Sequence, residues 1–585
     1  MKKIYLLFIS IVALAGCEDF LNRYPYDNIN SESAFESAIL AEGVVNGVYS
    51  NLIYDYATVD AARVNWDAFS SVMDPTNSLC TSKYNYLTGK IQTNNSIFLT
   101  YWKRYYEGIN RANDVINNLH KVPDMTQELK DRRIAECKFI RAYHYYRLNC
   151  LWRGVPVYLE NLAPAEYTRP RSSEKDVWQV IINDCTDAIN CASLPDKIDK
   201  GSADYGRITK GAAYTLRGKV YMWLKEYELA EADFLMVGKL GYALYNGSYA
   251  NLFKEANERC DEMIFSSQMV AKKGNGNCFS YVYGNYCTTG YGNSELLLNT
   301  NFVNSYEEVN GRPFDWNNYI SGYNEMSPKE RSVYFFRNNM DNNEMSQMAA
   351  YGAKMSDYDP TENEERIKRA YANRDPRLAA TAITPYAEYK GGASGKELTY
   401  VMRYPYRNWE HPVYDVRGSQ TTQMLYMIRK FVAVGRESTN IQFNPVDAPI
   451  FRYADVLLSL AEALNEQGQW AQALSYVNMV RTRAGVKPIN ADGYQGTPVA
   501  SSDDLRPKIR NEKKWELACE EQLYYEELRW ETWKKDKFST DNGLHNVWGD
   551  PIYTYSWGGE EYWKWPVPSS ECEKNGNLKQ NAGWL

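Results

Sequence analysis

The sequence from Pro449 to Gly485, PIFRYADVLLSLAEALNEQGQWAQALSYVNMVRTRAG, shows the pattern that decides the fold. Apolar residues recur at helical spacing up to Leu464 and again from Trp470 onward, which predicts two amphipathic helices. Gly468 lies between them and Gly485 follows them, where a left-handed residue can end a helix. The stretch therefore predicts a helical hairpin. Its small alanines permit the close approach typical of tetratricopeptide-type helix pairs.

The same pattern recurs from Thr209 to Gly241, TKGAAYTLRGKVYMWLKEYELAEADFLMVGKLG. Tyr227 is followed three positions later by an alanine, as Trp470 is in the first stretch, and a glycine closes the second helix in both. A single hairpin cannot bury its own apolar face and needs neighbours. Because the two hairpins are far apart in the chain rather than in tandem, we expect one helical platform assembled from both ends.

Further helical patterns flank these hairpins, and the middle of the chain differs from both ends. Helices are predicted over 33–52, 101–119, 134–152 and 509–533. Residues 241–448 are instead rich in Tyr, Asn and Gly, and 399–416 alternates well enough to contain a strand or two. We therefore predict a mainly α fold, a tetratricopeptide-like platform of helical pairs with a long inserted loop-rich region and a few short β-strands. The expected organisation is a signal peptide (1–16), an N-terminal helical part (17–240) and a C-terminal part (241–585), which comprises the insertion (241–448) and a helical region (449–585).

The N-terminus carries a targeting signal. Lys2 and Lys3 precede a short apolar run, which ends in Leu-Ala-Gly followed by Cys17. The run is too short to span a bilayer and is typical of a signal peptide. Leu-Ala-Gly-Cys is similar to a bacterial lipobox, so we predict lipidation of Cys17 and a membrane anchor through that lipid. An ordinary signal peptide with an incidental cysteine is the alternative. Glu18 and Asp19 resemble the acidic signal that directs Bacteroidetes lipoproteins to the cell surface.

The composition excludes several classes of function. The net charge of −7 argues against nucleic acid as a partner. The eleven cysteines form no Cys-x-x-Cys pair, so we expect mostly buried thiols. The four histidines are not spaced as a ligand pair, and the sequence lacks His-Glu-x-x-His, Gly-x-Ser-x-Gly and P-loop motifs. We therefore predict no catalytic residues, no metal site and no cofactor. The acidic run 357–362 could bind calcium, but a solvated loop is the better interpretation.

The positive signal is aromatic, with 49 tyrosines in the chain and 14% aromatic residues overall. Sugar rings present apolar faces and hydroxyl groups, so a sugar site needs flat rings beside polar side chains. Rings in the helical patterns are expected to be core residues. Those in three loop clusters, 275–293, 312–326 and 399–416, lie where binding residues usually occur on a rigid scaffold.

We predict a shallow ligand-binding face that combines rings of an early loop region with rings of the inserted region. Trp316 is the first choice, because its flanking residues are polar. The predicted ligand-binding residues are Asn65, Trp66, Asp67, Tyr84, Tyr86, Tyr283, Tyr291, Trp316, Asn317, Asn318, Tyr319 and Tyr323.

Five features in order resemble the SusD/RagB family of nutrient-binding outer-membrane lipoproteins of Bacteroidetes. They are the lipobox, RYADVLLSLAEALNEQG, VNMVRTRAG, IRNEKKWELACEEQ and the tail WPVPSSECEKNGNLKQNAGW. The resemblance covers essentially the whole chain. The sequence departs from the family pattern after Glu-Leu-Ala-x-Glu. The family commonly shows a glycine and an arginine there, whereas this chain has Glu521 and Leu523.

The resemblance implies a function and a partner. It implies tetratricopeptide-like helices that carry a loop-rich ligand face, an outer-membrane location facing the cell exterior, and no catalysis. The implied partner is a SusC-like TonB-dependent outer-membrane barrel, to which the lipoprotein delivers a captured oligosaccharide. Two alternatives remain at this stage. One is a peptide-binding member of the same fold, and the other is a glycoside hydrolase whose carboxylates are distant in sequence.

Overall fold

The computed structural model describes most of the chain beyond its N-terminal region. The described residues are 33–52, 65–76, 80–289, 294–392, 396–407, 413–418, 422–435, 437, 443–539 and 542–584. The predicted signal peptide, the lipidation residue Cys17 and the predicted site residue Tyr291 lie outside them. Among the described residues, no helix is long and apolar enough to cross a bilayer.

The predicted hairpin at 449–485 is confirmed. It consists of α18 (Tyr453–Glu466) and α19 (Trp470–Ala484). Gly468 and Gly485 both adopt left-handed backbone angles, with φ of +81° and +80°. The N–H of Val486 donates to the carbonyl oxygen of Arg481, which satisfies one of the free carbonyls at the end of α19. The glycines therefore end these helices as the sequence pattern predicts.

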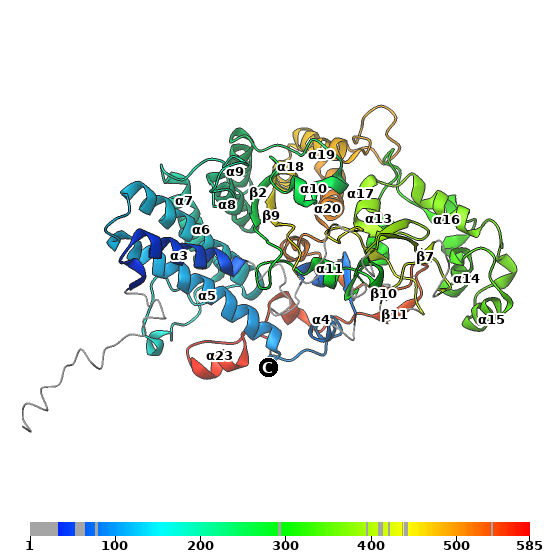
Figure 1. The fold of residues 1–585 in the computed structure, drawn as a ribbon, viewed down its shortest axis with the longest axis horizontal. Helices are drawn as coiled ribbons and strands as arrows, with labels where there is room; N and C mark the ends of the chain where they lie inside the picture. The colour runs from blue at the N-terminus through cyan, green and yellow to red at the C-terminus, as the bar shows by residue number, and fades with distance from the viewer. Residues whose placement is uncertain are drawn as a thin grey trace, which may run out of the picture.

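The second predicted hairpin is also confirmed, and it packs on the first. It consists of α8 (Lys210–Leu224) and α9 (Tyr227–Lys239), and α9 lies against α18 (Figure 1). Gly238 permits this contact, since an added Cβ would lie 2.7 Å from the hydroxyl oxygen of Tyr453. Both ends of the chain thus contribute to one platform, as predicted.

The other helices extend this platform. In the N-terminal part, α6 packs between α5 and α7, and α7 packs on α8. In Figure 1 these blue and cyan helices gather at one end of the molecule, with the orange α18 to α20 beside them. Their bounds are α3 (Ala38–Ser50), α4 (Thr81–Leu87), α5 (Ser96–Asn118), α6 (Gln127–Trp152), α7 (Glu174–Asn190), α20 (Ser502–Leu517), α21 (Leu523–Arg529), α22 (Trp533–Lys537) and α23 (Ser569–Lys574).

The prediction of one continuous helix over 509–533 is wrong. The structure breaks it between α20 and α21, where Cys519 and Glu521 adopt left-handed φ values of +69° and +65°. Glu521 is the residue that stands where the resembled family commonly has glycine. A non-glycine residue with such a φ carries backbone strain, so the surroundings must hold it in place.

The inserted region contains short helices and strands, as predicted. In Figure 1 its light green helices α14 to α16 lie at the end opposite the N-terminal helices. The helices are α10 (Tyr249–Leu252), α11 (Phe279–Val282), α12 (Tyr286–Thr289), α13 (Thr300–Ser305), α14 (Pro328–Ser332), α15 (Asn342–Tyr351), α16 (Asn363–Ala372) and α17 (Pro376–Thr381). The strands of the chain are β1 (Met73–Pro75), β2 (Met263–Ser267), β3 (Leu296–Leu298), β4 (Ala382–Ile383), β5 (Glu388–Gly391), β6 (Leu398–Val401), β7 (Tyr414–Asp415), β8 (Met427–Ile428), β9 (Ala448–Arg452), β10 (Gly543–His545) and β11 (Pro551–Thr554).

The strands pair mostly across long separations in sequence. Antiparallel pairs join β1 to β3, β2 to β9, β4 to β8 and β10 to β11. The pair β2–β9 closes the base of the insertion, because β9 leads directly into α18. The three-stranded sheet joins β5 to β6 antiparallel and β6 to β7 parallel, with Tyr400 opposite Tyr414. The strands β6 and β7 confirm the prediction made for 399–416.

A buried row of glutamates joins the platform to the insertion. Glu512 and Glu516 lie one turn apart on α20, and Glu520 follows just beyond the end of that helix. The row is neutralised by cations from four other segments. The buried ion pairs are Arg377 with Glu512 and Glu516, Arg481 with Glu512, Arg483 with Glu516, Arg452 with Glu516 and Glu520, and Lys430 with Glu520.

A second buried contact fixes the strained turn at Glu521. The Glu521 carboxylate accepts hydrogen bonds from the N–H groups of Trp66 and Asp67, at the start of a short 3₁₀ helix over Trp66–Phe69. In return the Asp67 carboxylate accepts hydrogen bonds from the backbone N–H groups of Glu521 and Leu523, with nitrogen–oxygen distances of 3.2 and 3.0 Å. Tyr283 of the insertion adds a hydrogen bond from its hydroxyl to Glu521 at 2.8 Å. This carboxyl pair joins an early loop, the insertion and the C-terminal helices.

The two carboxyl groups of this pair are hard to ionise together. Burial raises the pKa of Glu521 to about 7, although the hydrogen bonds from Tyr283 and Asn65 oppose the shift. Burial also raises the pKa of Asp67, and the neighbouring Glu521 charge adds to that effect. Because the folded state keeps a proton that the unfolded chain has lost, the contribution of Glu521 to stability is full below its unfolded pKa of 4.5. That contribution falls as the pH rises toward 7.

We predict that Glu521→Gln reduces the loss of stability between pH 5 and 8. Glutamine mimics the protonated carboxyl, so it avoids the cost of ionising the buried pair, which is on the order of 2–3 kcal/mol for a shift of this size. The measurement is the free energy of unfolding by urea at each pH. Glu531→Gln is the matched control, because Glu531 also has a left-handed φ, of +58°, and its side chain is exposed. Equal pH slopes for the wild type and Glu521→Gln would contradict this account.

Candidate functional site

The structure buries two of the rings predicted in the early loop region. Trp66 and Tyr86 are both fully buried, and each packs within a cluster of core rings. The ring centroid of Trp66 lies 4.7 Å from that of Tyr101 and 5.4 Å from that of Trp565. Tyr86 packs against Tyr562 at 4.9 Å. The prediction that a sugar stacks on Trp66 and Tyr86 is therefore wrong for this structure, because neighbouring rings already cover their faces.

Asn65, Asp67 and Tyr283 come together, as predicted, but in the core rather than on a ligand face. All three are buried around the carboxylate of Glu521. The side-chain amide of Asn65 also donates to the Tyr283 hydroxyl at 2.6 Å. Their polar groups are used to hold the strained turn, so the prediction that they bind a ligand is corrected.

Trp316 and Tyr323 are also core residues. Trp316 is 5% exposed, and its ring lies 5.1 Å from Tyr323 and 5.3 Å from Phe335. Its indole N–H donates to the Asn304 side chain at 3.3 Å. The polar residues around Trp316 in sequence face solvent while the indole points inward, as a short 3₁₀ turn over Trp316–Asn318 allows. Sequence polarity therefore misled the prediction for both rings.

The remaining described members of the predicted site are at least partly exposed. Tyr84 packs edge-on against Tyr553 at 5.0 Å, and Tyr319 stacks on Phe314 at 5.8 Å. Asn317 is half-buried and Asn318 is exposed. A ligand role for these four residues remains a prediction. The ring contacts of Trp316 and Tyr319 lie within the insertion and those of Tyr84 with β11, so the predicted residues form separate groups rather than one face.

The structure instead assembles a group of tyrosines around Arg417, in which Tyr286, Tyr406 and Tyr414 are half-exposed and Tyr400 is buried. The guanidinium of Arg417 lies 5.1 Å from the ring centroid of Tyr286 and 5.9 Å from that of Tyr406. Beside them, Tyr400 of β6 and Tyr414 of β7 pack with ring centroids 5.7 Å apart. We call these five residues the tyrosine–arginine surface. It joins two of the loop clusters identified in the sequence, 275–293 and 399–416.

Close backbone contacts hold Tyr286 against the three-stranded sheet. The N–H of Tyr286 donates to the carbonyl oxygen of Arg417 at 3.0 Å. At the end of β5, Gly391 approaches the next residue of α12 so closely that an added Cβ would lie 2.1 Å from the Cys287 carbonyl oxygen. Gly392 then donates its N–H to the carbonyl oxygen of Thr288 at 2.9 Å. The two glycines are therefore required for close approach, not for phosphate binding.

Asp415 makes the β7 side of this surface rigid. Its buried carboxylate pairs with Arg337 at 2.9 Å and with Arg403 at 2.5 Å. It also accepts the N–H of Arg407 at 2.7 Å. A carboxylate that accepts several charge-assisted hydrogen bonds is held firmly, so the neighbouring Tyr414 has a fixed position.

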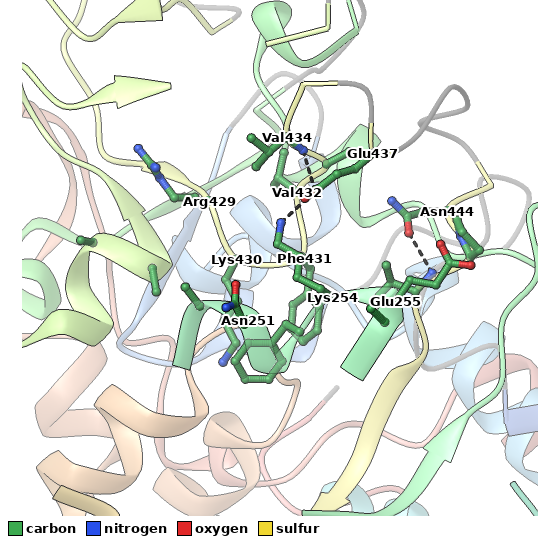
Figure 2. A pocket seen from close by; sticks show the side chains of 18 of the residues that line it. Asn251, Lys254, Glu255, Arg429, Lys430, Phe431, Val432, Val434, Glu437 and Asn444 are labelled. Carbon is green, nitrogen blue, oxygen red and sulfur yellow. Dashed lines mark hydrogen bonds and ion pairs between the residues drawn. The ribbon is translucent and has the colours of Figure 1, made fainter. Parts of the chain in front are cut away.

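A cavity of about 910 Å³ is lined by the segment 429–434, which follows β8, and by residues in and after α10 (Figure 2). Phe431 at its base has a left-handed φ of +62° and packs against Phe253. The preceding Lys430 points away from the cavity, and its ammonium donates to the Tyr249 hydroxyl, the Ala518 carbonyl and Glu520. Across the rim, Lys254 pairs with Glu437 at 2.8 Å.

The cavity and the tyrosine–arginine surface differ in what they offer a sugar. Phe253 and Phe431 are only 6% and 7% exposed, so their ring faces are covered by the protein. The rings of Tyr286, Tyr406 and Tyr414 are half-buried and keep part of their area accessible. Stacking on a sugar requires an accessible ring face with hydrogen-bond donors beside it. The tyrosine–arginine surface meets this requirement better than the cavity does.

Sequence reasoning missed Tyr286, Tyr406 and Arg417 as site residues. The two tyrosines lie inside loop clusters that were identified, but composition alone does not show which ring of a cluster stays exposed. Arg417 lies just outside its cluster. The three residues meet only because α12 packs against the sheet of β5, β6 and β7.

The fold is a helical platform that carries the tyrosine–arginine surface on inserted loops. A model of the SusD family matches residues 261–584, and one described as starch-binding associating with outer membrane matches residues 19–222. The chain belongs to the SusD family.

Individual relatives are similar over nearly the whole chain. SusD-like protein P25 of Formosa agariphila is 24% identical, covering 91% of this chain and 90% of its own length. A SusD-like protein of Bacteroides fragilis has a similar fold, with a TM-score of 0.72, 22% identity, and coverage of 96% of this chain and 100% of that one. Surface glycan-binding protein A of Bacteroides thetaiotaomicron, in complex with laminarihexaose, has a TM-score of 0.60 and 18% identity, with coverage of 93% and 99%.

We predict that Trp316→Ala destabilises the protein rather than its ligand complex. Removing a buried indole leaves a cavity, at a cost of about 3–5 kcal/mol. Urea denaturation measures the loss, and Asn318→Ala in the same turn is the control, because its side chain is exposed. Normal stability of Trp316→Ala together with weakened glycan binding would contradict this prediction and indicate that Trp316 contacts the ligand.

Proposed function

We propose that this protein binds oligosaccharides at the tyrosine–arginine surface and does not transform them. The observation that carries the proposal is the group of half-exposed tyrosine rings around one arginine, on loops held by a SusD-family platform. The rings supply flat faces for the apolar side of a pyranose, and the guanidinium and hydroxyl groups supply hydrogen bonds.

The proposal extends to delivery and location. We propose that the protein is anchored to the outer membrane through lipid on Cys17, faces the cell exterior, and passes the bound oligosaccharide to a SusC-like TonB-dependent barrel. The lipobox-like Leu-Ala-Gly-Cys supports the anchor, and the family description of association with the outer membrane supports the location. The laminarihexaose complex of the B. thetaiotaomicron relative supports an oligosaccharide as the ligand.

We predict that Tyr286→Ala weakens oligosaccharide binding by about 1–3 kcal/mol, by analogy with other aromatic stacking contacts. Folding should be little affected, because the hydrogen bond from residue 286 to Arg417 uses only backbone atoms. The test is a glycan array with the purified protein, followed by calorimetric titration of the tightest binder. Tyr476→Ala is the control, since Tyr476 is a half-buried tyrosine of α19 on the platform.

An assay for reducing ends on the same mixtures of protein and oligosaccharide separates binding from catalysis. The protein should leave the oligosaccharide intact, and new reducing ends formed with turnover would support the glycoside hydrolase alternative instead. Absence of binding to every oligosaccharide, or unchanged affinity in Tyr286→Ala, would contradict the proposed site.

We predict that Cys17→Ala releases the protein from the membrane without unfolding it, because the residue precedes the packed body of the chain. Metabolic labelling with a radioactive fatty acid and membrane fractionation measure the effect. Membrane retention equal to that of the wild type, with label still incorporated, would contradict lipidation at this residue.

A further inference from the structure

The guanidinium of Arg417 lies against aromatic rings. It lies between Tyr286 and Tyr406, and all three side chains are half-buried. Its positive charge lowers the pKa of the Tyr406 hydroxyl, against the larger effect of burial, which raises that pKa. The guanidinium also donates a hydrogen bond to the Tyr406 hydroxyl, which lowers the same pKa. A guanidinium has five N–H donors and an aromatic face accepts no conventional hydrogen bond, so other donors of Arg417 stay available.

Other arginines, near the tyrosine–arginine surface but not part of it, have carboxylate partners. Asp415, two positions before Arg417, is shared by Arg337 and Arg403, and Arg407 pairs with Glu344 at 2.6 Å. Over the residues that the structure describes, no carboxylate lies within ion-pair distance of Arg417. Within that described part, Arg417 is thus a partly exposed guanidinium that lacks a partner anion.

We propose that the anion belongs to the ligand, and that Arg417 binds the carboxylate or sulfate group of an acidic oligosaccharide. This inference rests on the proposed function and adds the charge of the glycan. A guanidinium presents two parallel N–H donors that match the oxygens of either oxyanion. The flanking tyrosines hold the donors in place and offer ring faces to the same sugar unit or to its neighbour.

The preference for an acidic sugar follows from the strength of the contact. A hydrogen bond between two charged partners is worth roughly twice one to a neutral hydroxyl, and a half-buried guanidinium without an anion is left incompletely solvated. Each 1.4 kcal/mol corresponds to about tenfold in affinity. An acidic oligosaccharide should therefore bind about tenfold more tightly than its neutral counterpart.

The experiment compares three probes of the same length and of comparable galactose-based backbones. These are oligogalacturonate, its carboxyl-reduced neutral form, and a sulfated galacto-oligosaccharide. Affinity is measured by calorimetry for the wild type, Arg417→Gln and Tyr286→Ala. Arg417→Gln keeps polar groups but removes the charge. Arg366→Gln is the matched control, because Arg366 is a half-buried arginine of α16 that lies 5.2 Å from the ring centroid of Tyr334.

We expect at least one acidic probe to bind about tenfold more tightly than the neutral one, and Arg417→Gln to remove that advantage. Whichever of the carboxylate and the sulfate binds more tightly identifies the natural anion. Arg366→Gln should change neither affinity. The advantage of the acidic probe should also shrink as ionic strength rises, because salt screens exposed charges.

Three results would overturn the inference in different ways. If the neutral probe binds as tightly as the acidic ones and Tyr286→Ala weakens it, the ligand is a neutral oligosaccharide and the proposed function still holds. If Arg417→Gln weakens the binding of neutral and acidic probes equally, Arg417 serves only as a hydrogen-bond donor to any sugar and does not select for an anion. If no probe binds the wild type, the charge assignment is wrong, and the glycan array decides separately whether this surface binds another oligosaccharide.

Discussion

The neutralisation of the buried glutamates on and after α20 constrains the rest of the structure. Three carboxylates, Glu512, Glu516 and Glu520, are removed from water and must be balanced by cations brought from other segments. Removing one partner of such a pair leaves an uncompensated buried charge, which typically costs 3–5 kcal/mol. Arg452 supplies one of these cations from the base of the insertion, and Lys430 supplies another from the wall of the cavity. The platform and the insertion are therefore tied together by charge as well as by apolar packing.

This frame reaches the tyrosine–arginine surface through a short series of contacts. Lys430 fixes the segment 429–434, whose Ala433 carbonyl oxygen accepts the Tyr389 hydroxyl of β5 at 3.0 Å. The far end of β5 touches α12 through Gly391, and α12 begins at Tyr286. The exposed rings are thus held at the end of a rigid series of contacts. A preformed site of this kind loses little conformational entropy when it binds a ligand.

Helical periodicity predicted the platform because its two hairpins repeat one pattern, with glycines at 241, 468 and 485 in the left-handed conformation that ends a helix. The break after Leu517 was missed, since Glu521 is not a residue that sequence rules place at positive φ. Contacts with distant residues, Asn65, Trp66, Asp67 and Tyr283, hold it there. The site was predicted less well for a related reason. Whether a ring such as Trp316 or Tyr286 is exposed depends on partners far away in sequence, and local composition does not contain that information.

The central claim is that the tyrosine–arginine surface holds the sugar, and a crystal structure of the protein with a bound oligosaccharide tests it most directly. The account predicts density for a pyranose against the ring of Tyr286 or Tyr406, with an oxygen of the ligand within hydrogen-bond distance of the Arg417 guanidinium. An oligosaccharide bound instead in the cavity lined by Lys254 and Phe431, or on the helical platform, with Arg417 untouched, would contradict it.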